Sequence, residues 1–229
     1  MEILGIIPAR GNSKGIPRKN LALLAGKSLL QYTAEAAKGS KSLTRTMVST
    51  DDQEIAEAGK KLGLEVPFLR PEVFAKDDTP MLDVLLDLLQ TLEKDGYSPD
   101  LLVLLQPTSP LRTSMDIDEA IRLLQDMDAD TVVSVVPIPH QFTPACAQRM
   151  IDGALIPFLD GPEILQRQKK EPLYARNGPA IVVCKVSSLQ TKGFYGGKTV
   201  PYVMPLERSL DIDGPEELAY AEFLLHKQA

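Results

Sequence analysis

The sequence predicts an α/β fold in which helices cover both faces of a mostly parallel sheet. Two observations indicate this class. Short apolar runs alternate with amphipathic stretches along most of the chain, and residues 101–105 form a wholly apolar run, as in strands buried on both faces. Strand, helix and strand in succession favour right-handed crossovers. A length of 229 residues fits one sizeable core, so we expect a single domain over 1–229.

The individual elements follow from periodicity and from boundary residues. Short runs rich in apolar and β-branched residues predict strands at 3–8, 46–49, 64–68, 101–105, 131–136, 180–185 and 199–203. Apolar residues recurring on one face predict helices at 27–38, 52–62, 79–94, 115–127 and 215–226. Ser28 opens the first helix with Gln31 three residues later, and Pro80 and Pro215 stand at first helical positions.

The regular pattern stops between Pro137 and Pro172, where six prolines interrupt the chain and neither period survives. A stretch of this length inside a compact domain is commonly a lid, a binding arm or an oligomer contact. We therefore expect residues 137–175 to protrude from the sheet.

Composition and charge exclude several functional classes. A net charge of −6 argues against general binding to nucleic acids or to anionic membrane surfaces. The longest apolar runs are far shorter than the ~20 residues that span a bilayer. The first residues do not have the pattern of a signal peptide. Cys146 and Cys184 lack a metal-site or redox spacing, and we interpret both as packing residues. We expect a cytoplasmic protein that binds neither nucleic acid nor membrane.

Residues 7–20, Ile-Pro-Ala-Arg-Gly-Asn-Ser-Lys-Gly-Ile-Pro-Arg-Lys-Asn, form the most informative segment because they follow the first strand. Ligands of open parallel sheets bind beyond the carboxyl ends of strands. Gly11 and Gly15 let the backbone approach a ligand closely, and successive N–H groups can form an anion-binding concavity. Four positive charges stand within ten positions: Arg10, Lys14, Arg18 and Lys19. The segment therefore predicts a polyphosphate site.

Two familiar nucleotide loops do not fit this segment. The dinucleotide fingerprint G-x-G-x-x-G is missing, and no Lys directly follows the second glycine as a P-loop requires. A solvated basic turn is the plain structural alternative. The density of glycine and charge directly behind a first strand favours phosphate binding over such a turn.

The same segment resembles the nucleotide-binding signature of the acylneuraminate cytidylyltransferases, also called CMP-sialic acid synthetases. Other segments resemble blocks of this family in its order and cover nearly the whole chain: Val48-Ser49-Thr50-Asp51, Leu69-Arg70-Pro71, Asp78-Thr79, LQPTSPLR at 105–112, Asn177-Gly178 and Ser209-Leu210-Asp211-Ile212-Asp213. The resemblance implies a Rossmann-like three-layer nucleotidyltransferase fold and a homodimer, with 137–175 as its dimerisation or sugar-side segment. It also implies Mg²⁺ as cofactor and transfer of CMP from CTP to a nine-carbon α-keto acid sugar, with release of pyrophosphate.

Roles for single residues also follow from the resemblance. It implies that the nucleotide is bound by Ala9, Arg10, Gly11, Asn12, Ser13, Lys14, Lys19, Asn20, Arg70 and Thr79. The implied catalytic residues are Arg10, Lys19 and Asp211. The implied sugar-binding residues are Gln106, Arg167, Tyr174 and Asn177. Mg²⁺ would be bound by Asp211 and Asp213.

Elementary chemistry supports the metal pair but leaves alternatives. Carboxylates two residues apart in an extended segment point to the same face and can share a hard cation. Asp213 is also suited to cap a helix before Pro215. Gln106 is alternatively a buried amide at a strand end, and Arg167 a member of a solvated charge run. The proton acceptor is open between a metal-activated water and a carboxylate such as Asp211.

One departure from the family pattern leaves the sugar open. Many members carry Asn-Gly-Ala-Ile-Tyr where this chain has Asn-Gly-Pro-Ala-Ile at 177–181, so an aromatic residue is missing. Tyr174, Phe194 and Tyr195 are candidates to replace it. The possible acceptors are N-acetylneuraminate, legionaminate, pseudaminate and ketodeoxynonulosonate. The rival functions are a cytidylyltransferase for eight-carbon keto-deoxy-octulosonate and a catalytically silent nucleotide-binding module.

Overall fold

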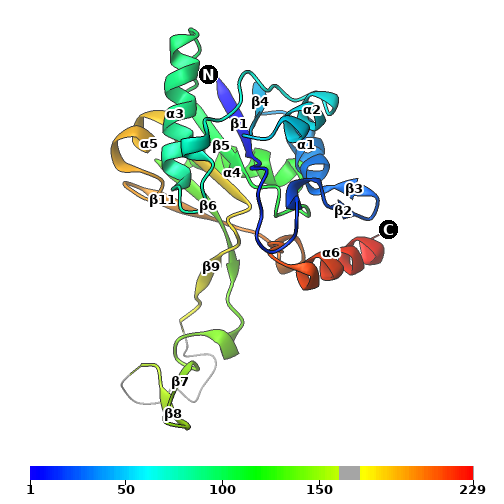
Figure 1. Cartoon of the computed structure of the whole chain (residues 1–229). Coiled ribbons are helices and arrows are strands. Elements are labelled where there is room, and N and C mark those ends of the chain that lie inside the picture. Colours follow the sequence, from blue (N-terminus) through cyan, green and yellow to red (C-terminus); the bar gives the residue numbers. More distant parts are fainter. Residues whose placement is uncertain (160–170, 229) are drawn as a thin grey trace.

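Among the described residues, a seven-stranded sheet runs through the molecule, with strand order β11-β6-β10-β5-β1-β4 and with β9 (Tyr174–Arg176) paired to β6 (Figure 1). The computed structural model describes residues 1–159 and 171–228. β1 (Ile3–Pro8) is parallel to β4 (Arg45–Ser49) and β5 (Leu101–Leu105), and β11 (Thr199–Val203) is parallel to β6 (Thr131–Pro137). β10 (Ile181–Lys185) is antiparallel to both β5 and β6. The prediction of a mostly parallel sheet is confirmed.

Helices cover both faces of this sheet, which gives three layers (Figure 1). α1 (Leu29–Gly39), α2 (Gln53–Lys61) and α4 (Ser114–Asp126) pack on one face. α3 (Met81–Lys94) and α5 (Val186–Lys192) pack on the other. Alternation along β1 serves both layers, because Ile3 and Ile7 face the first set of helices while Leu4 and Ile6 face the second. The strand at 101–105 is buried at every residue, as its composition predicts.

Boundary residues start the helices much as expected. The Ser28 hydroxyl accepts a hydrogen bond from the Gln31 N–H at the start of α1. Thr113 and Asp116 form a capping box at the start of α4, which satisfies main-chain N–H groups on both sides. α6 (Pro215–Gln228) begins at the predicted proline. α3 begins one residue after Pro80, which lies in extended backbone at the cap position, so Thr79 is outside the helix.

Besides short strands at 23–24, 27–28 and 174–176 that were not predicted, three features of the described residues differ from the sequence prediction. The strand expected at 64–68 is wrong, because only Glu65 makes a bridge, to Met47, and Pro67 has no N–H to continue the pairing. The helix α5 was not predicted, since its seven residues are too few to show a clear period. The third is a hairpin inside the proline-rich stretch, formed by β7 (Gln148–Ile151) and β8 (Ala154–Pro157).

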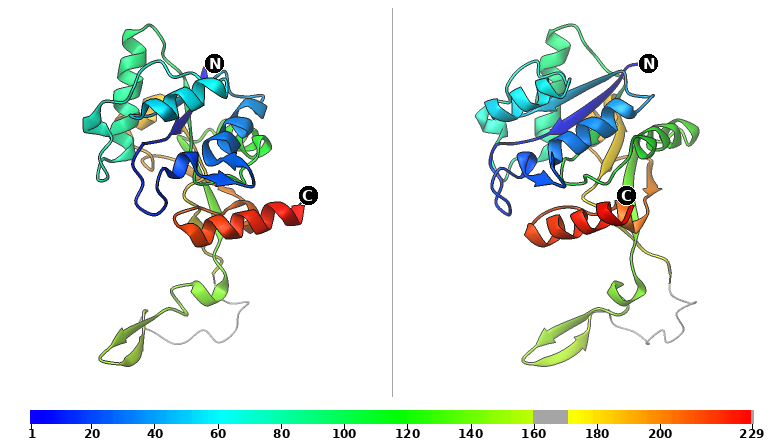
Figure 2. Two further views of the ribbon diagram at one scale, coloured as in Figure 1. Left: turned by 45° about the vertical axis from the view of Figure 1, so that its right-hand side comes forward. Right: turned by 90° about the vertical axis from the view of Figure 1, so that its right-hand side faces the viewer.

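The described part of the proline-rich stretch protrudes from the body as an arm, here defined as residues 137–159 and 171–175 (Figures 1 and 2). Its root is the antiparallel pairing of β6 with β9 (Tyr174–Arg176). The β7–β8 hairpin lies toward its tip, and every residue of that hairpin is exposed. Asp152 and Gly153 both have positive φ and form the tight turn, and this Asp-Gly pair between apolar residues was the local signal for the hairpin.

The C-terminal segment returns to the beginning of the chain. α6 packs on the short hairpin of β2 (Leu23–Leu24) and β3 (Lys27–Ser28), through a cluster of Leu24, Leu29, Ile212 and Ala221 with Ile16 against it. This cluster brings the segment before α6 next to the segment after β1. Within the described ranges, no helix combines the length and the apolar character needed to cross a membrane.

Candidate active site

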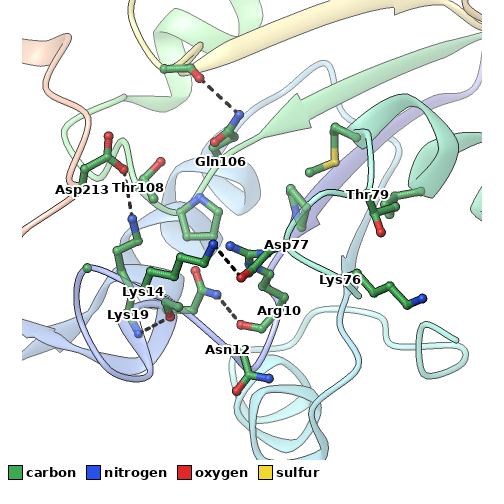
Figure 3. Close-up of a pocket in the computed structure, with 18 of the residues that line it drawn as sticks. Arg10, Asn12, Lys14, Lys19, Lys76, Asp77, Thr79, Gln106, Thr108 and Asp213 are labelled. Atoms are coloured by element: carbon green, nitrogen blue, oxygen red, sulfur yellow. Dashed lines mark hydrogen bonds and ion pairs between the residues drawn. The ribbon is translucent and has the colours of Figure 1, made fainter. Parts of the chain in front are cut away.

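A cleft of about 490 Å³ opens at the carboxyl ends of β1 and β5 (Figure 3). The chain passes from β1 to β4 on one side and then returns to β5 on the other side of β1, so these two ends form the switch point of the sheet. Ligands of α/β sheets bind at such points because the two loops diverge there and leave a crevice. Pro8 and Arg10 follow β1 into the cleft, and Gln106, Pro107 and Thr108 follow β5.

The loop after β1 is shaped by hydrogen bonds and by close packing at glycine. The Gly11 N–H donates to Asp51, and a Cβ at Gly11 would lie 2.8 Å from the Asp52 carboxylate, so a larger residue does not fit. The Ser13 hydroxyl accepts from the Lys19 N–H, and the Asn20 amide donates to the Arg10 carbonyl. These bonds fold the loop back on itself.

Three of the four cations of this loop line the cleft. Arg10 and Lys14 both contact the Asp77 carboxylate, at 2.7 and 2.9 Å. Lys19 lies on the other wall, where its Nζ donates to the Ile212 carbonyl at 2.9 Å and to Asp213 at 3.1 Å. The fourth cation, Arg18, is held outside the cleft because it pairs with Asp52 and Glu54 at the start of α2.

Asp211 and Asp213 line the same cleft, on either side of the buried Ile212. The Ile212 N–H donates to the Thr108 carbonyl, which fixes this segment beside the end of β5. Burial raises the pKa of Asp211, and the neighbouring charge of Asp213 adds to that rise. Its Oδ1 is buried and has no hydrogen-bond partner among the described residues. A carboxylate oxygen of this kind is stabilised by a cation.

A magnesium ion fits this pair by donor chemistry. Hard cations prefer carboxylate oxygens, and Mg²⁺ is commonly held by one or two carboxylates together with substrate phosphates and water. The described residues contain no group of three or more His, Cys, Asp or Glu side chains suited to a metal, so most of the ligands would have to come from phosphate oxygens or water. The unpaired Oδ1 of Asp211 is the observation that favours a cation here.

Two further walls complete the cleft. On one, Arg70 is buried and its guanidinium donates to the hydroxyl and carbonyl oxygens of Ser49, while the Thr79 hydroxyl donates to the Val73 carbonyl. On the other, the Gln106 amide donates to the Gly178 carbonyl at 3.4 Å. Gly178 has a φ of 111°, and a Cβ there would stand 3.1 Å from the Asp211 carboxylate.

The profile of the cytidylyltransferase family matches residues 4–228. This chain belongs to the cytidylyltransferase family. It is therefore a nucleotidyltransferase enzyme, as the sequence resemblance implied.

Two curated relatives are similar to this cytidylyltransferase over nearly its whole length. It is 35% identical over 231 residues to a CMP-N,N'-diacetyllegionaminic acid synthase of Legionella pneumophila, with 98% of this chain and 97% of that protein covered. It is 34% identical over 225 residues to an N-acylneuraminate cytidylyltransferase of Streptococcus agalactiae, covering 96% of this chain and 52% of the relative. The chain thus spans about half the length of the second relative.

Solved structures of low sequence identity share the fold. A CMP:2-keto-3-deoxy-manno-octonic acid synthetase complexed with CTP matches with a TM-score of 0.70 at 16% identity, over 100% of both chains. A 4-diphosphocytidyl-2C-methyl-D-erythritol synthase matches with a TM-score of 0.67 at 11% identity, over 98% of this chain and 99% of the other. The three-layer nucleotidyltransferase fold is confirmed.

The cytidylyltransferase fold brings most of the predicted site residues into one cleft. Those that line it are Arg10, Asn12, Ser13, Lys14, Lys19, Asn20, Arg70, Thr79, Gln106, Asp211 and Asp213. Ala9 is buried in the core, and Gly11 shapes the loop without lining the cleft. The roles assigned to all of these residues stay predictions.

The predicted sugar-side residues are placed less favourably. Asn177 is buried, and its side-chain amide already makes hydrogen bonds with the Ser134 hydroxyl, the Ser209 hydroxyl and the Ala180 N–H. Tyr174 lies on the arm root, away from the cleft of its own chain. Phe194 and Tyr195 pair with each other at 6.1 Å between ring centroids and do not line the cleft. Arg167 lies outside the described residues.

Sequence reasoning missed two charged residues of the cleft, Lys76 and Asp77. They lie in an irregular segment between the 3-10 turn at Glu72–Phe74 and α3, where a run of charge has no local signature. Thr108 and Gly178 also line the cleft. Both belong to blocks that resemble the family, next to the predicted residues Gln106 and Asn177, and this position could have indicated them as site residues.

Proposed function

We propose that this cytidylyltransferase transfers CMP from CTP to a nine-carbon α-keto acid sugar and releases pyrophosphate. The observation that carries the proposal is the meeting of the loop after β1 with the acidic pair, through the contact of Lys19 with Asp213. The contact supports the proposal because the loop expected to bind phosphate and the candidate metal pair then share one cleft. The names of the Legionella and Streptococcus relatives support a nonulosonate acceptor over an eight-carbon sugar.

The reaction needs no protein nucleophile. The oxygen of the anomeric hydroxyl attacks the α-phosphorus, and its new bond forms as the bond from that phosphorus to the oxygen between the α- and β-phosphorus atoms breaks. The hydroxyl proton passes to a base, either water or a carboxylate such as Asp211, and pyrophosphate leaves with the electron pair of the broken bond. Positioning and charge neutralisation supply most of the rate in such transfers. When bound, Mg²⁺ would supply charge neutralisation at the phosphate oxygens.

Each of these requirements has a candidate side chain in the cleft. Lys19 lies beside Asp213, and its ammonium would stabilise charge at the α-phosphate. Arg10 and Lys14 lie across the cleft, where they would bind the rest of the triphosphate. Asn20, Arg70 and Thr79 would surround the cytidine, and Gln106 would face the sugar. Asp211 and Asp213 would hold Mg²⁺.

The arm suits a homodimer contact. Met150, Leu155 and Phe158 are apolar, and each is at least 45% exposed. Exposed apolar clusters on a protruding element commonly bury themselves in an interface. Dimerisation through 137–175, one domain over 1–229 and a cytoplasmic location stay predictions.

Burial of Cys184 raises the pKa of its thiol to about 12, in keeping with a packing role and not with a reactive thiol.

The test is pyrophosphate release from CTP and Mg²⁺ with a panel of keto acid sugars. Release with N-acetylneuraminate, legionaminate, pseudaminate or ketodeoxynonulosonate supports the proposal and names the acceptor. Release only with keto-deoxy-octulosonate supports the eight-carbon rival. Binding of CTP without release for any sugar supports a silent binding module. Lys19→Met is the matched inactive variant, because it removes the charge and keeps the length of the side chain.

A further inference from the structure

The Asp77 carboxylate binds two cations of the nucleotide loop at once. Its Oδ1 lies 2.7 Å from Arg10 Nη1, and its Oδ2 lies 2.9 Å from Lys14 Nζ (Figure 3). Hydrogen bonding to Lys14, together with the charge of Arg10, holds the pKa of Asp77 below its usual value, so the carboxylate is ionised at neutral pH. Both cations belong to the cleft, and Asp77 lines the cleft with them.

The three cations that the loop after β1 contributes to the cleft fall into two groups. Lys19 lies with the acidic pair, whereas Arg10 and Lys14 lie with Asp77. Under the proposed function, the reacting α-phosphate lies by Lys19 and the acids. The β- and γ-phosphates then extend toward Arg10 and Lys14. A carboxylate makes the same charge-assisted hydrogen bonds to Arg and Lys as a phosphate does, so the two compete for one place.

We propose that Asp77 is an intramolecular competitor for the β- and γ-phosphates, which weakens binding of CTP and of pyrophosphate and thereby speeds pyrophosphate release. The inference rests on the proposed function and concerns the same cleft. After the transfer, pyrophosphate is held by Arg10 and Lys14 without its covalent link to CMP. The return of Asp77 to these two cations then displaces it.

The contact is poorly suited to a purely structural role. The side chains of Lys14 and Asp77 are 79% and 44% exposed, and exposed ion pairs contribute little to stability. Asp77 also comes from an irregular segment outside any helix or strand, so its movement disrupts no regular element. A change at Asp77 is therefore expected to alter anion affinity and to leave the fold intact.

The test measures binding of three ligands to the full chain by titration calorimetry with Mg²⁺: CTP, inorganic pyrophosphate and CMP. The variants are Asp77→Asn, Asp77→Ser as a second form without an amide, and Glu72→Gln as the control. Glu72 lies five residues before Asp77, in the 3-10 turn at Glu72–Phe74. It is exposed, and its side chain makes no ion pair or hydrogen bond within the described part of the chain. The control thus removes one negative charge without freeing Arg10 or Lys14.

Both Asp77 variants are expected to bind CTP and pyrophosphate roughly three- to tenfold more tightly, as expected for loss of two partly exposed ion pairs. CMP, which lacks the outer phosphates, is expected to bind as in the wild type. Pyrophosphate should also become a stronger product inhibitor. Unchanged or weaker pyrophosphate binding in both variants, or an equal gain in Glu72→Gln, overturns the inference. Failure of the wild type to bind CTP overturns the proposed function instead.

Discussion

Gly15 packs directly against Asp213, so that a Cβ at Gly15 would stand 1.9 Å from the Asp213 carbonyl oxygen. This contact joins a loop near the start of the chain to an acidic segment near its end. The same two segments are joined by the hydrogen bonds of Lys19 to Ile212 and Asp213. The cleft therefore depends on a close approach of main chain to main chain that only glycine permits.

Gly15→Ala is expected to inactivate the enzyme without unfolding it. The methyl group must push the loop away from the acidic segment, because the opposing atom belongs to the backbone. A displacement of about 1 Å is expected to lower kcat/KM about 10²-fold. The measurement is pyrophosphate release with the sugar that serves as acceptor.

Gly39→Ala is the control for this change. Gly39 lies at the far end of α1, where the added methyl group meets only the Ser114 side chain, at 3.1 Å. We expect its activity to match the wild type, because neither Gly39 nor Ser114 lines the cleft. Full activity in Gly15→Ala would show that the loop and the acidic segment need not be in contact.

Asp211→Asn is expected to remove the response to magnesium and to preserve the fold. Burial disfavours the charged form of Asp211, so the neutral amide should leave Tm unchanged or raise it at neutral pH. Loss of a metal ligand should lower turnover at least about 10²-fold. In thermal unfolding with CTP present, Mg²⁺ should raise Tm for the wild type and not for the variant. An equal Mg²⁺ response in both proteins would contradict the metal assignment.

The sequence predicts the fold well where periodicity is strong. The runs at 3–8 and 101–105 coincide with strands because their apolar residues must be buried. The run at 199–203 coincides with the edge strand β11, in which exposed and half-buried residues alternate. The direction of β10 could not be predicted, since alternation of elements says nothing about which way a returning strand crosses the sheet. The apolar run at 64–68 was wrongly predicted as a strand, because this segment forms only a single bridge, from Glu65 to Met47.

The site was predicted by composition more than by geometry. Lys19 and Asp213 could be assigned to one nucleotide from the family resemblance, but their contact depends on the packing of α6, which no local pattern shows. In the sequence, Arg18 cannot be told apart from the other three cations of the loop, Arg10, Lys14 and Lys19. Its backbone is left-handed, with a φ of 52°, and its side chain pairs with α2 instead of entering the cleft. Asp77 was missed because an exposed charged turn is usually solvated.

The hairpin at the tip of the arm is expected to form a dimer contact. Met150 and Leu155 are directly opposite in the β7–β8 register, so their side chains share one face, and they are 77% and 65% exposed. Light scattering should give the wild type twice the chain mass of 25.1 kDa. The double variant Met150→Asp and Leu155→Asp should give a monomer. Met127→Asp, at an exposed methionine outside the arm, is the control and should leave the mass unchanged; a dimer in both variants would place the interface elsewhere.

Asp116 on α4 anchors the segment that leads into the acidic pair. The Arg208 guanidinium donates two hydrogen bonds to this buried carboxylate, and the Tyr202 hydroxyl donates a third. Burial alone would raise the pKa of Asp116, but the hydrogen bonds from Arg208 and Thr113 outweigh it and hold the pKa below its usual value of 3.8. The pair therefore stabilises the folded state fully above that usual value, and the contribution is lost as the pH falls through the lower folded-state value.

Asp116→Asn is expected to destabilise the protein by about 3 kcal/mol, because it leaves the Arg208 charge without its partner. For a chain of this size, that corresponds to a fall in Tm of about 6 to 12 °C at neutral pH. The difference from the wild type should shrink as the pH falls below about 3.8, where Asp116 takes up a proton in the unfolded chain, and should be lost once the pH passes the lower folded-state pKa. Arg122→Ala, which breaks the exposed pair with Asp126 on the same helix, should change Tm little. A Tm difference that stays constant into acid would show that the ionised carboxylate is not the source of the stability.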